Sequence, residues 1–145
     1  MKRAIATVGG LGYLPKLPGT AGSAVGLGLA WLIGADPARL AAGALAVTAL
    51  GLWSAGAAER VIGVKDPHAI IIDEVAGMMV ALVALPVTWK VYLAGFLLFR
   101  LLDITKPLGL RRVERLPGSW GIMMDDLLAG ALTHALVRAA LPLLS

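Results

Sequence analysis

The run of residues 40–58 is predominantly apolar and contains no charged side chain. It is about as long as a helix that crosses the hydrocarbon core of a bilayer, which needs about 20 residues. Four further apolar runs occupy residues 20–33, 69–89, 91–102 and 127–144. Hydrophobic residues make up 59% of the chain and charged residues 15%, whereas soluble domains average about 45–50% and about 25%. These proportions exclude an ordinary soluble helical domain.

The predicted fold is therefore a single membrane-embedded domain over residues 1–145, all-α and polytopic, with about five helices, some of them short. The run 91–102 is the least secure of the five, because twelve residues are too few to cross a bilayer without flanking residues. The N-terminal residues are interrupted by glycine and proline, so we expect no cleavable signal peptide.

The formal net charge of +4 is spread thinly between the apolar runs. A nucleic-acid-binding surface would instead cluster Lys and Arg on one polar face, so we expect no nucleic-acid partner. Cysteine is absent, which excludes disulfides, thiolate metal ligands and a cysteine nucleophile. The sequence does not indicate an oligomeric state.

Lys and Arg alternate between the connections of the predicted helices. The successive connections carry three, one, two, one, four and no basic residues. Because the excess of basic residues marks the cytoplasmic side, the N-terminus and the connections 59–68 and 103–126 are predicted to face the cytoplasm.

Five of the nine acidic residues lie at the predicted cytoplasmic ends of three apolar runs. Asp73 and Glu74 lie near the start of one run, and Asp103 follows another. Asp125 and Asp126 precede the last run. Carboxylates beside hydrocarbon are costly unless they have a function, and Mg²⁺ prefers oxygen ligands from carboxylates, water and phosphate. We therefore predict that these five residues bind Mg²⁺ for phosphoryl transfer or hydrolysis.

Two basic residues and one glycine-containing segment are candidates for binding phosphate. Arg100 and Lys106 each lie three residues from the aspartate between them, so they could balance that carboxylate and neutralise phosphate oxygens. Gly19, Thr20 and Ser23 begin the first apolar run and could present N–H groups and hydroxyls to a phosphate at a helix N-terminus.

Each of these features also has a purely structural explanation. The helix macrodipole stabilises a carboxylate at a helix N-terminus by about 0.3–1 kcal/mol without any metal, which would account for either acidic pair taken singly. Arg100 could extend towards water, and Ser23 could face inward beside an N-cap. Gly77 and Gly130 each follow an aspartate by four residues and would allow close helix packing. Convergence of three acidic sites on one membrane face favours the functional explanation.

Four motifs together resemble the phosphatidylglycerophosphatase A family of membrane lipid phosphatases. They are GYLPKLPGTAGS at 12–23, IIDEVAGMM at 71–79, FRLLDITKP at 99–107 and GSWGIMMDDLLAG at 118–130. Their order and spacing cover most of the chain, although each motif is short. The positions that match the family's acidic and basic motif residues are Asp73, Glu74, Asp103, Asp125, Asp126, Arg100 and Lys106.

The resemblance implies Mg²⁺-dependent hydrolysis of the terminal phosphomonoester of phosphatidylglycerophosphate, which yields phosphatidylglycerol and phosphate in phospholipid biosynthesis. It also implies a multi-pass protein of the bacterial cytoplasmic membrane, acting on a phospholipid in that membrane from the cytoplasmic face. Asp126, Glu74, Arg100 and Lys106 are the expected catalytic residues. Without a cysteine or a motif histidine, the alternatives are direct attack by water, with Asp126 or Glu74 as base, and an aspartyl-phosphate intermediate. Direct attack is favoured because no Asp-x-Asp arrangement is present.

Other functional classes remain as alternatives. A CDP-alcohol phosphatidyltransferase would also use metal-bound aspartates at the cytoplasmic face, but its dispersed four-aspartate signature is missing here. A small transporter would more naturally place its carboxylates near the bilayer midplane. A non-enzymatic scaffold subunit would leave the convergence of acidic residues unexplained.

Overall fold

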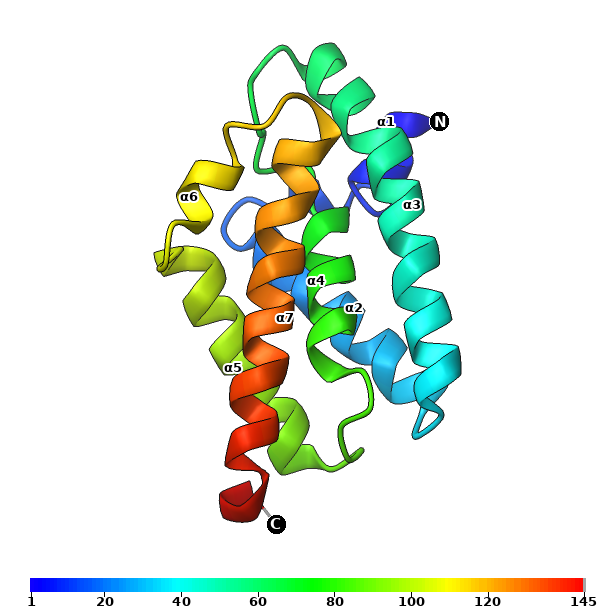
Figure 1. Ribbon diagram of the computed structural model, residues 1–145. Coiled ribbons are helices and arrows are strands. Elements are labelled where there is room, and N and C mark those ends of the chain that lie inside the picture. Colours follow the sequence, from blue (N-terminus) through cyan, green and yellow to red (C-terminus); the bar gives the residue numbers. More distant parts are fainter. Residues whose placement is uncertain (145) are drawn as a thin grey trace.

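The computed structural model describes residues 1–144, which form helices and loops without any strand (Figure 1). The all-α prediction is confirmed. In chain order the elements are α1 (Lys2–Ala6), the 3-10 turn η1 (Leu11–Tyr13), α2 (Pro18–Ile33), α3 (Pro37–Ile62), α4 (Ile72–Leu82), α5 (Trp89–Thr105), α6 (Leu110–Val113) and α7 (Ser119–Leu144).

Two helices, α3 and α7, are each 26 residues long and are apolar enough to cross a membrane. The helix α4 has only 11 residues, which corresponds to about 16 Å against about 30 Å of hydrocarbon core. The prediction of one continuous helix over 69–89 is therefore wrong. The helix ends at Leu82, and Pro86 in the following loop disfavours helical backbone at the residue before it.

The helix α7 begins at Ser119, eight residues earlier than the apolar run 127–144. Asp125 and Asp126 consequently lie inside the helix, and the first turn of α7 contains no acidic residue. The helix macrodipole cannot account for this pair, because its effect decays within the first turn. That explanation is available only for the acidic residues in the first turn of α4.

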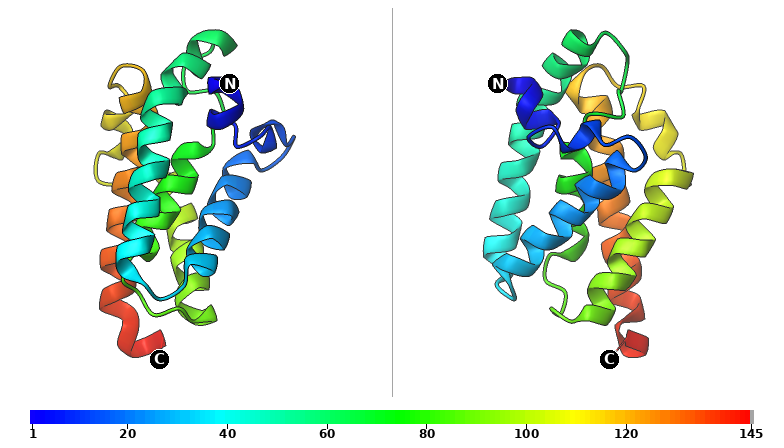
Figure 2. Two further views of the ribbon diagram at one scale, coloured as in Figure 1. Left: turned by 90° about the vertical axis from the view of Figure 1, so that its right-hand side faces the viewer. Right: turned by 180° about the vertical axis from the view of Figure 1, so that it is seen from behind.

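The short helix α4 lies at the centre of the bundle and packs against α2, α3 and α7 (Figures 1 and 2). Nine of its eleven residues are buried. Glycines bring the neighbouring backbones close to it. A Cβ on Gly130 would lie 2.2 Å from the Gly77 carbonyl oxygen. A Cβ on Gly22 would lie 2.7 Å from the carbonyl oxygen of the residue before α4, and a Cβ on Gly26 would lie 2.6 Å from a carbonyl oxygen of α4. The close helix packing expected at Gly77 and Gly130 is confirmed.

The connections separate into two groups at opposite ends of the bundle (Figures 1 and 2). The N-terminus, the loop before α4 and the segment containing α6 lie at one end. The loops before α3 and α5 and the end of α7 lie at the other. The first group corresponds to the connections that were predicted to share one side of a membrane, and the identity of that side stays a prediction.

Candidate active site

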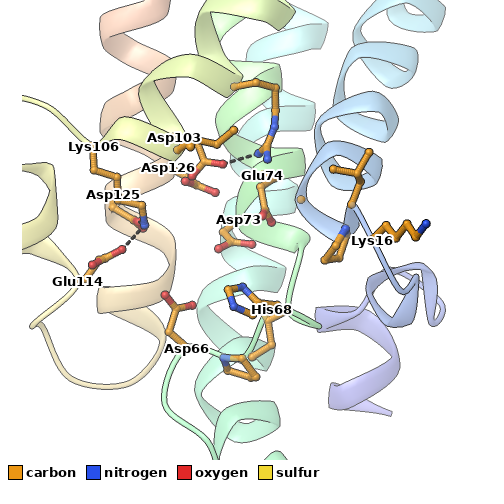
Figure 3. Close-up of a pocket in the computed structure, with 17 residues that line it drawn as sticks. Lys16, Asp66, His68, Asp73, Glu74, Asp103, Lys106, Glu114, Asp125 and Asp126 are labelled. Carbon is orange, nitrogen blue, oxygen red and sulfur yellow. Dashed lines mark hydrogen bonds and ion pairs between the residues drawn. The ribbon is translucent and has the colours of Figure 1, made fainter.

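A pocket of about 350 Å³ opens at the end of the bundle that carries the N-terminus and α6 (Figure 3). Its wall combines side chains from the start of α2, the loop before α4, the first turn of α4, the end of α5 and the second turn of α7. The charged residues that line it are Lys16, Asp66, Asp73, Glu74, Arg100, Asp103, Lys106, Glu114, Asp125 and Asp126.

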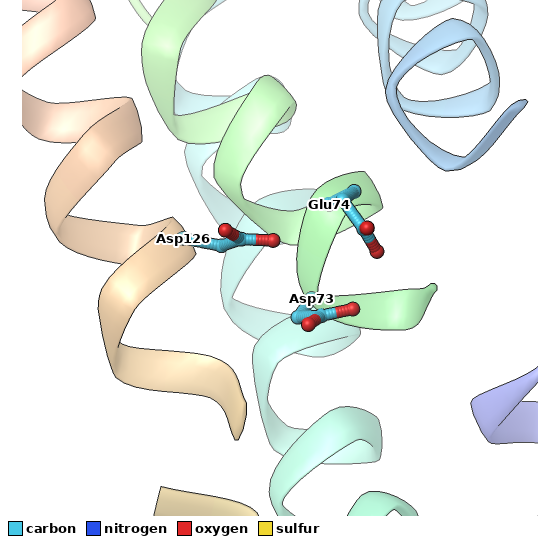
Figure 4. A group of neighbouring side chains, drawn as sticks. All are labelled: Asp73, Glu74 and Asp126. Atoms are coloured by element: carbon cyan, nitrogen blue, oxygen red, sulfur yellow. The ribbon is translucent and has the colours of Figure 1, made fainter. Parts of the chain in front are cut away.

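Three carboxylates that line the pocket, from Asp73, Glu74 and Asp126, lie close together, and we call them the inner cluster (Figure 4). One oxygen from each carboxylate can be chosen so that all three lie within 4.8 Å of one another. Asp73 is 6% exposed and Asp126 is 2% exposed. The inner cluster therefore concentrates acidic groups where little water can separate them.

Two oxygens of the inner cluster, Asp73 Oδ1 and Glu74 Oε2, are buried and have no hydrogen-bond partner among residues 1–144. Buried charged oxygens without partners are strongly unfavourable. A divalent cation would satisfy these oxygens and remove the repulsion between the carboxylates. Mg²⁺ is a hard cation that binds carboxylate oxygens, so the residues present fit such an ion.

The spacing of the inner cluster is set by the contact between α4 and α7. Gly77 lies one turn after Asp73, and Gly130 lies one turn after Asp126. Besides the contact at Gly130, a Cβ on Gly77 would lie 2.5 Å from the Asp126 carbonyl oxygen. Because the two backbones touch here, the two aspartates on the preceding turns face each other.

Arg100 forms an ion pair with Asp103 one turn later on α5. Its Nε is buried and has no hydrogen-bond partner among the described residues, so one donor of the guanidinium is left unsatisfied. Gly19 allows Glu74 and Arg100 to pack against the start of α2, because a Cβ there would lie 2.6 Å from Glu74 Oε1 and 3.1 Å from Arg100 Nη1.

Lys106 lies between two carboxylates, which with it form what we call the outer cluster (Figure 3). Its Nζ is 2.5 Å from Asp125 Oδ2 and also pairs with Glu114. Burial alone would lower the pKa of Lys106, but the hydrogen bonds to Asp125 and Glu114 outweigh it and raise the pKa above its ordinary value. The lysine therefore remains a cation at any physiological pH.

The pairing of Lys106 differs from the one that its spacing predicted. An i,i+3 contact with Asp103 requires both residues to be helical, whereas Lys106 is the C-cap of α5 with a left-handed backbone, φ 45°. The cap redirects the side chain to α6 and α7. The expected contact of Asp103 is confirmed for Arg100 only.

Eight of the ten residues predicted for the site line this pocket. Thr20 and Ser23 do not. Ser23 is fully buried and its hydroxyl donates to the Gly19 carbonyl oxygen at 2.9 Å within α2. Asp103 and Asp125, predicted as metal ligands, lie outside the inner cluster, and each is paired with a basic side chain.

Sequence reasoning did not select Glu114, Lys16 or His68, which also line the pocket. The only signal for Glu114 was its position as a lone acid within a basic connection. Asp66 was expected on this face but not in the site. Its backbone N–H donates to Glu59 Oε1 at 2.8 Å, which fixes the loop that brings it to the pocket.

The chain is similar to known proteins over most of its length. A family profile described as phosphatidylglycerophosphatase A matches residues 4–141. A Bacteroides thetaiotaomicron protein, provisionally named a phosphatidylinositol-3-phosphatase, is 39% identical over 145 residues, covering 94% of this chain and 91% of the relative. Escherichia coli phosphatidylglycerophosphatase A is 34% identical over 131 residues, covering 88% of this chain and 76% of the relative.

A third relative, phosphatidylglycerophosphatase A of Haemophilus influenzae, is 44% identical over 70 residues, which cover 47% of this chain and 43% of the relative. No solved structure matches the chain. The family match covers nearly the whole chain, including every residue of the inner and outer clusters. The chain therefore belongs to the phosphatidylglycerophosphatase A family of lipid phosphatases.

Proposed function

We propose that this phosphatase hydrolyses the terminal phosphomonoester of phosphatidylglycerophosphate to phosphatidylglycerol and phosphate, as a step of phospholipid biosynthesis, and that it depends on Mg²⁺. The observation that carries this proposal is the inner cluster, in which three neighbouring carboxylates include buried oxygens without partners. Such a group suits a cation and a phosphate together, and the relatives' names supply the lipid class.

Asp73, Glu74 and Asp126 would hold the Mg²⁺ ion. When bound there, the ion supplies positive charge that polarises a phosphate oxygen and favours deprotonation of water. We assign Asp103 and Asp125 a different role from the metal binding that their positions suggested. Because each is already paired with a cation, they fix the side chains that receive the phosphate.

Arg100 and Lys106 bind the phosphate oxygens in this proposal. Arg100 offers its unpartnered Nε, and Lys106 supplies a permanent positive charge at the opposite wall. Glu74, which is less buried than Asp126, accepts a proton from the attacking water. The water oxygen bonds to phosphorus, the bond from phosphorus to the lipid oxygen breaks, and the proton passes to the departing lipid alcohol.

We further propose that α3 and α7 cross the bacterial cytoplasmic membrane as part of a five-helix polytopic bundle. The pocket would then face the cytoplasm. Three arginines of the connection between α5 and α7 support this orientation, since Arg111, Arg112 and Arg115 are exposed at the pocket end and would attract anionic lipid.

Phosphate release by the purified protein in detergent tests the proposal. With Mg²⁺, the wild type should release phosphate from phosphatidylglycerophosphate, and Asp126→Asn should lower kcat/KM by about 10³-fold. Asp36→Asn is the matched control, because Asp36 caps α3 at the opposite end of the bundle and asparagine caps a helix equally well. No release by the wild type, or equal release by wild type and Asp126→Asn, would overturn the assignment.

Two further substrates separate the neighbouring possibilities. Faster release from phosphatidylinositol 3-phosphate would favour the activity for which the Bacteroides relative is named. Consumption of CDP-diacylglycerol with an alcohol would indicate a phosphatidyltransferase instead. The stereochemical course at phosphorus decides the mechanism, because one direct attack inverts the configuration and an aspartyl-phosphate intermediate retains it.

A further inference from the structure

We propose that the apolar groove between α2 and α5 holds one acyl chain of the lipid substrate while the phosphate occupies the active-site pocket. This proposal rests on the lipid phosphatase function proposed above. The groove has a volume of about 430 Å³ and is lined only by apolar and aromatic residues. Its wall includes Ala24, Leu27 and Trp31 of α2 and Tyr92, Leu93 and Phe96 of α5.

One face of α5 passes directly from the groove into the pocket. Leu93 and Phe96 line the groove, and Arg100 and Ile104 line the pocket. These positions are spaced by three and four residues, so they lie on one face of the helix. A lipid whose phosphate contacts Arg100 therefore has an apolar path along the same helix.

The helix α2 forms the opposite wall in the same order. Gly19, in its first turn, lines the pocket, and Ala24 and Trp31 line the groove further along. Side chains or backbone of the two helices meet at both ends of the groove. At the pocket end a Cβ on Gly19 would lie 3.1 Å from Arg100 Nη1, and at the far end the rings of Trp31 and Tyr92 meet edge to face at 5.2 Å.

The path from the active-site pocket to the far end of the groove suits an acyl chain in one leaflet. Gly19 and Trp31 are twelve residues apart on α2, which corresponds to about 18 Å, whereas half of a hydrocarbon core is about 15 Å. The side chains along this path are substantially exposed, with Leu93 47% and Trp31 48% accessible. An acyl chain would cover this apolar surface, which has no other partner among the described residues.

A second apolar groove, between α5 and α7, supplies a comparison. Its wall includes Leu97 and Leu101 of α5, which lie about a third of a turn round the helix from Phe96 and Arg100. Neither groove shares a lining residue with the active-site pocket. The second groove has the same apolar character but lies on a different face of α5 from Arg100, so it should contact bulk lipid only.

The test compares groove-filling variants on substrates that differ only in chain length. Ala24→Trp and Leu93→Trp fill the α2–α5 groove from opposite walls, and Leu97→Trp is the matched control in the α5–α7 groove. All three positions are exposed, so the added rings do not overpack a core. Phosphatidylglycerophosphate with two long chains, or with two six-carbon chains, is presented to the full-length protein at a fixed detergent ratio, and KM and kcat are measured separately.

We expect either groove variant to raise KM for the long-chain substrate by about tenfold, because the added ring removes packing contacts between the groove and the acyl chain. The KM for the six-carbon substrate should change by less than about twofold, and kcat should be unchanged. Equal changes on both substrates, no change on either, or an equal effect of Leu97→Trp would overturn the acyl-chain site. Absence of phosphate release from both substrates by the wild type would instead overturn the proposed function.

Discussion

The inner and outer clusters lie in one pocket and contain the same kinds of acidic side chain, yet only the charges of the outer cluster are neutralised by a basic side chain. In the outer cluster, Lys106 neutralises Asp125 and Glu114. In the inner cluster, no basic side chain pairs with Asp73 or Asp126 among residues 1–144, and two buried oxygens have no partner. A carboxylate that is already paired stabilises the fold and positions its partner. A buried carboxylate without a partner indicates a ligand.

The largest effect should come from Asp73→Asn. Activity should fall by about 10³-fold with loss of a proposed metal ligand, whereas the Tm of the protein in EDTA should rise by a few degrees, because the variant removes a like charge from the inner cluster. Thermal unfolding with and without Mg²⁺ measures both parts. Mg²⁺ should raise the Tm of the wild type only. A lower Tm for Asp73→Asn in EDTA would show that the carboxylate is a structural group.

A smaller effect is expected when the spacing of the inner cluster is changed and its charges are kept. In Gly130→Ala the new methyl would lie 2.2 Å from the Gly77 carbonyl oxygen, so α4 and α7 must separate. The free energy of unfolding should fall by about 1–3 kcal/mol. The kcat should fall by about 10²-fold, because catalysis depends on positions within about 1 Å.

Gly28→Ala is the control for the helix spacing, since a Cβ there has nothing within 4 Å and alanine is favoured over glycine in a helix by about 1 kcal/mol. It should be as stable as the wild type or slightly more stable, with unchanged activity. Equal behaviour of the two alanine variants would show that the contact between α4 and α7 does not set the site.

The smallest loss of activity should come from Lys106→Met in the outer cluster. Removing the lysine leaves Asp125 and Glu114 without their shared cation, so stability should fall by about 2 kcal/mol and activity by about tenfold. Chemical denaturation measures the first and phosphate release the second. The double variant Lys106→Met/Asp125→Asn should recover part of the stability. Lys65→Met, at an exposed loop position, should change neither.

The sequence was most informative where a residue's position along the chain determines its depth in the bundle. Asp73 and Glu74 could be placed in the site because they follow a loop and precede an apolar run. The glycines four residues after Asp73 and Asp126 could be identified as packing positions, because small residues on one helix face allow backbones to touch. Both inferences need only helical periodicity.

The remaining features depend on contacts between segments distant in the sequence. Assigning Asp126 to the inner cluster and Asp125 to the outer cluster requires knowing where α7 begins. The apolar residues Ile122 and Met123, which precede the two acids, are the sequence evidence that this helix begins before them. The partners of Lys106 depend on a left-handed cap that no local residue pattern demands, since lysine rarely adopts it. The position of Glu114 in the pocket could be found only from the path of the chain through α6.

The shortness of α4 has a consequence for how such a protein is made. Eleven residues are too few to be accepted by the insertion machinery as an independent membrane segment, and two of them carry acids. We expect α4 to enter the bilayer only together with its longer neighbours α3 and α7. A nascent chain that ends before α7 would lack both Asp126 and Gly130, so competence for chemistry would arise at the last stage of biogenesis.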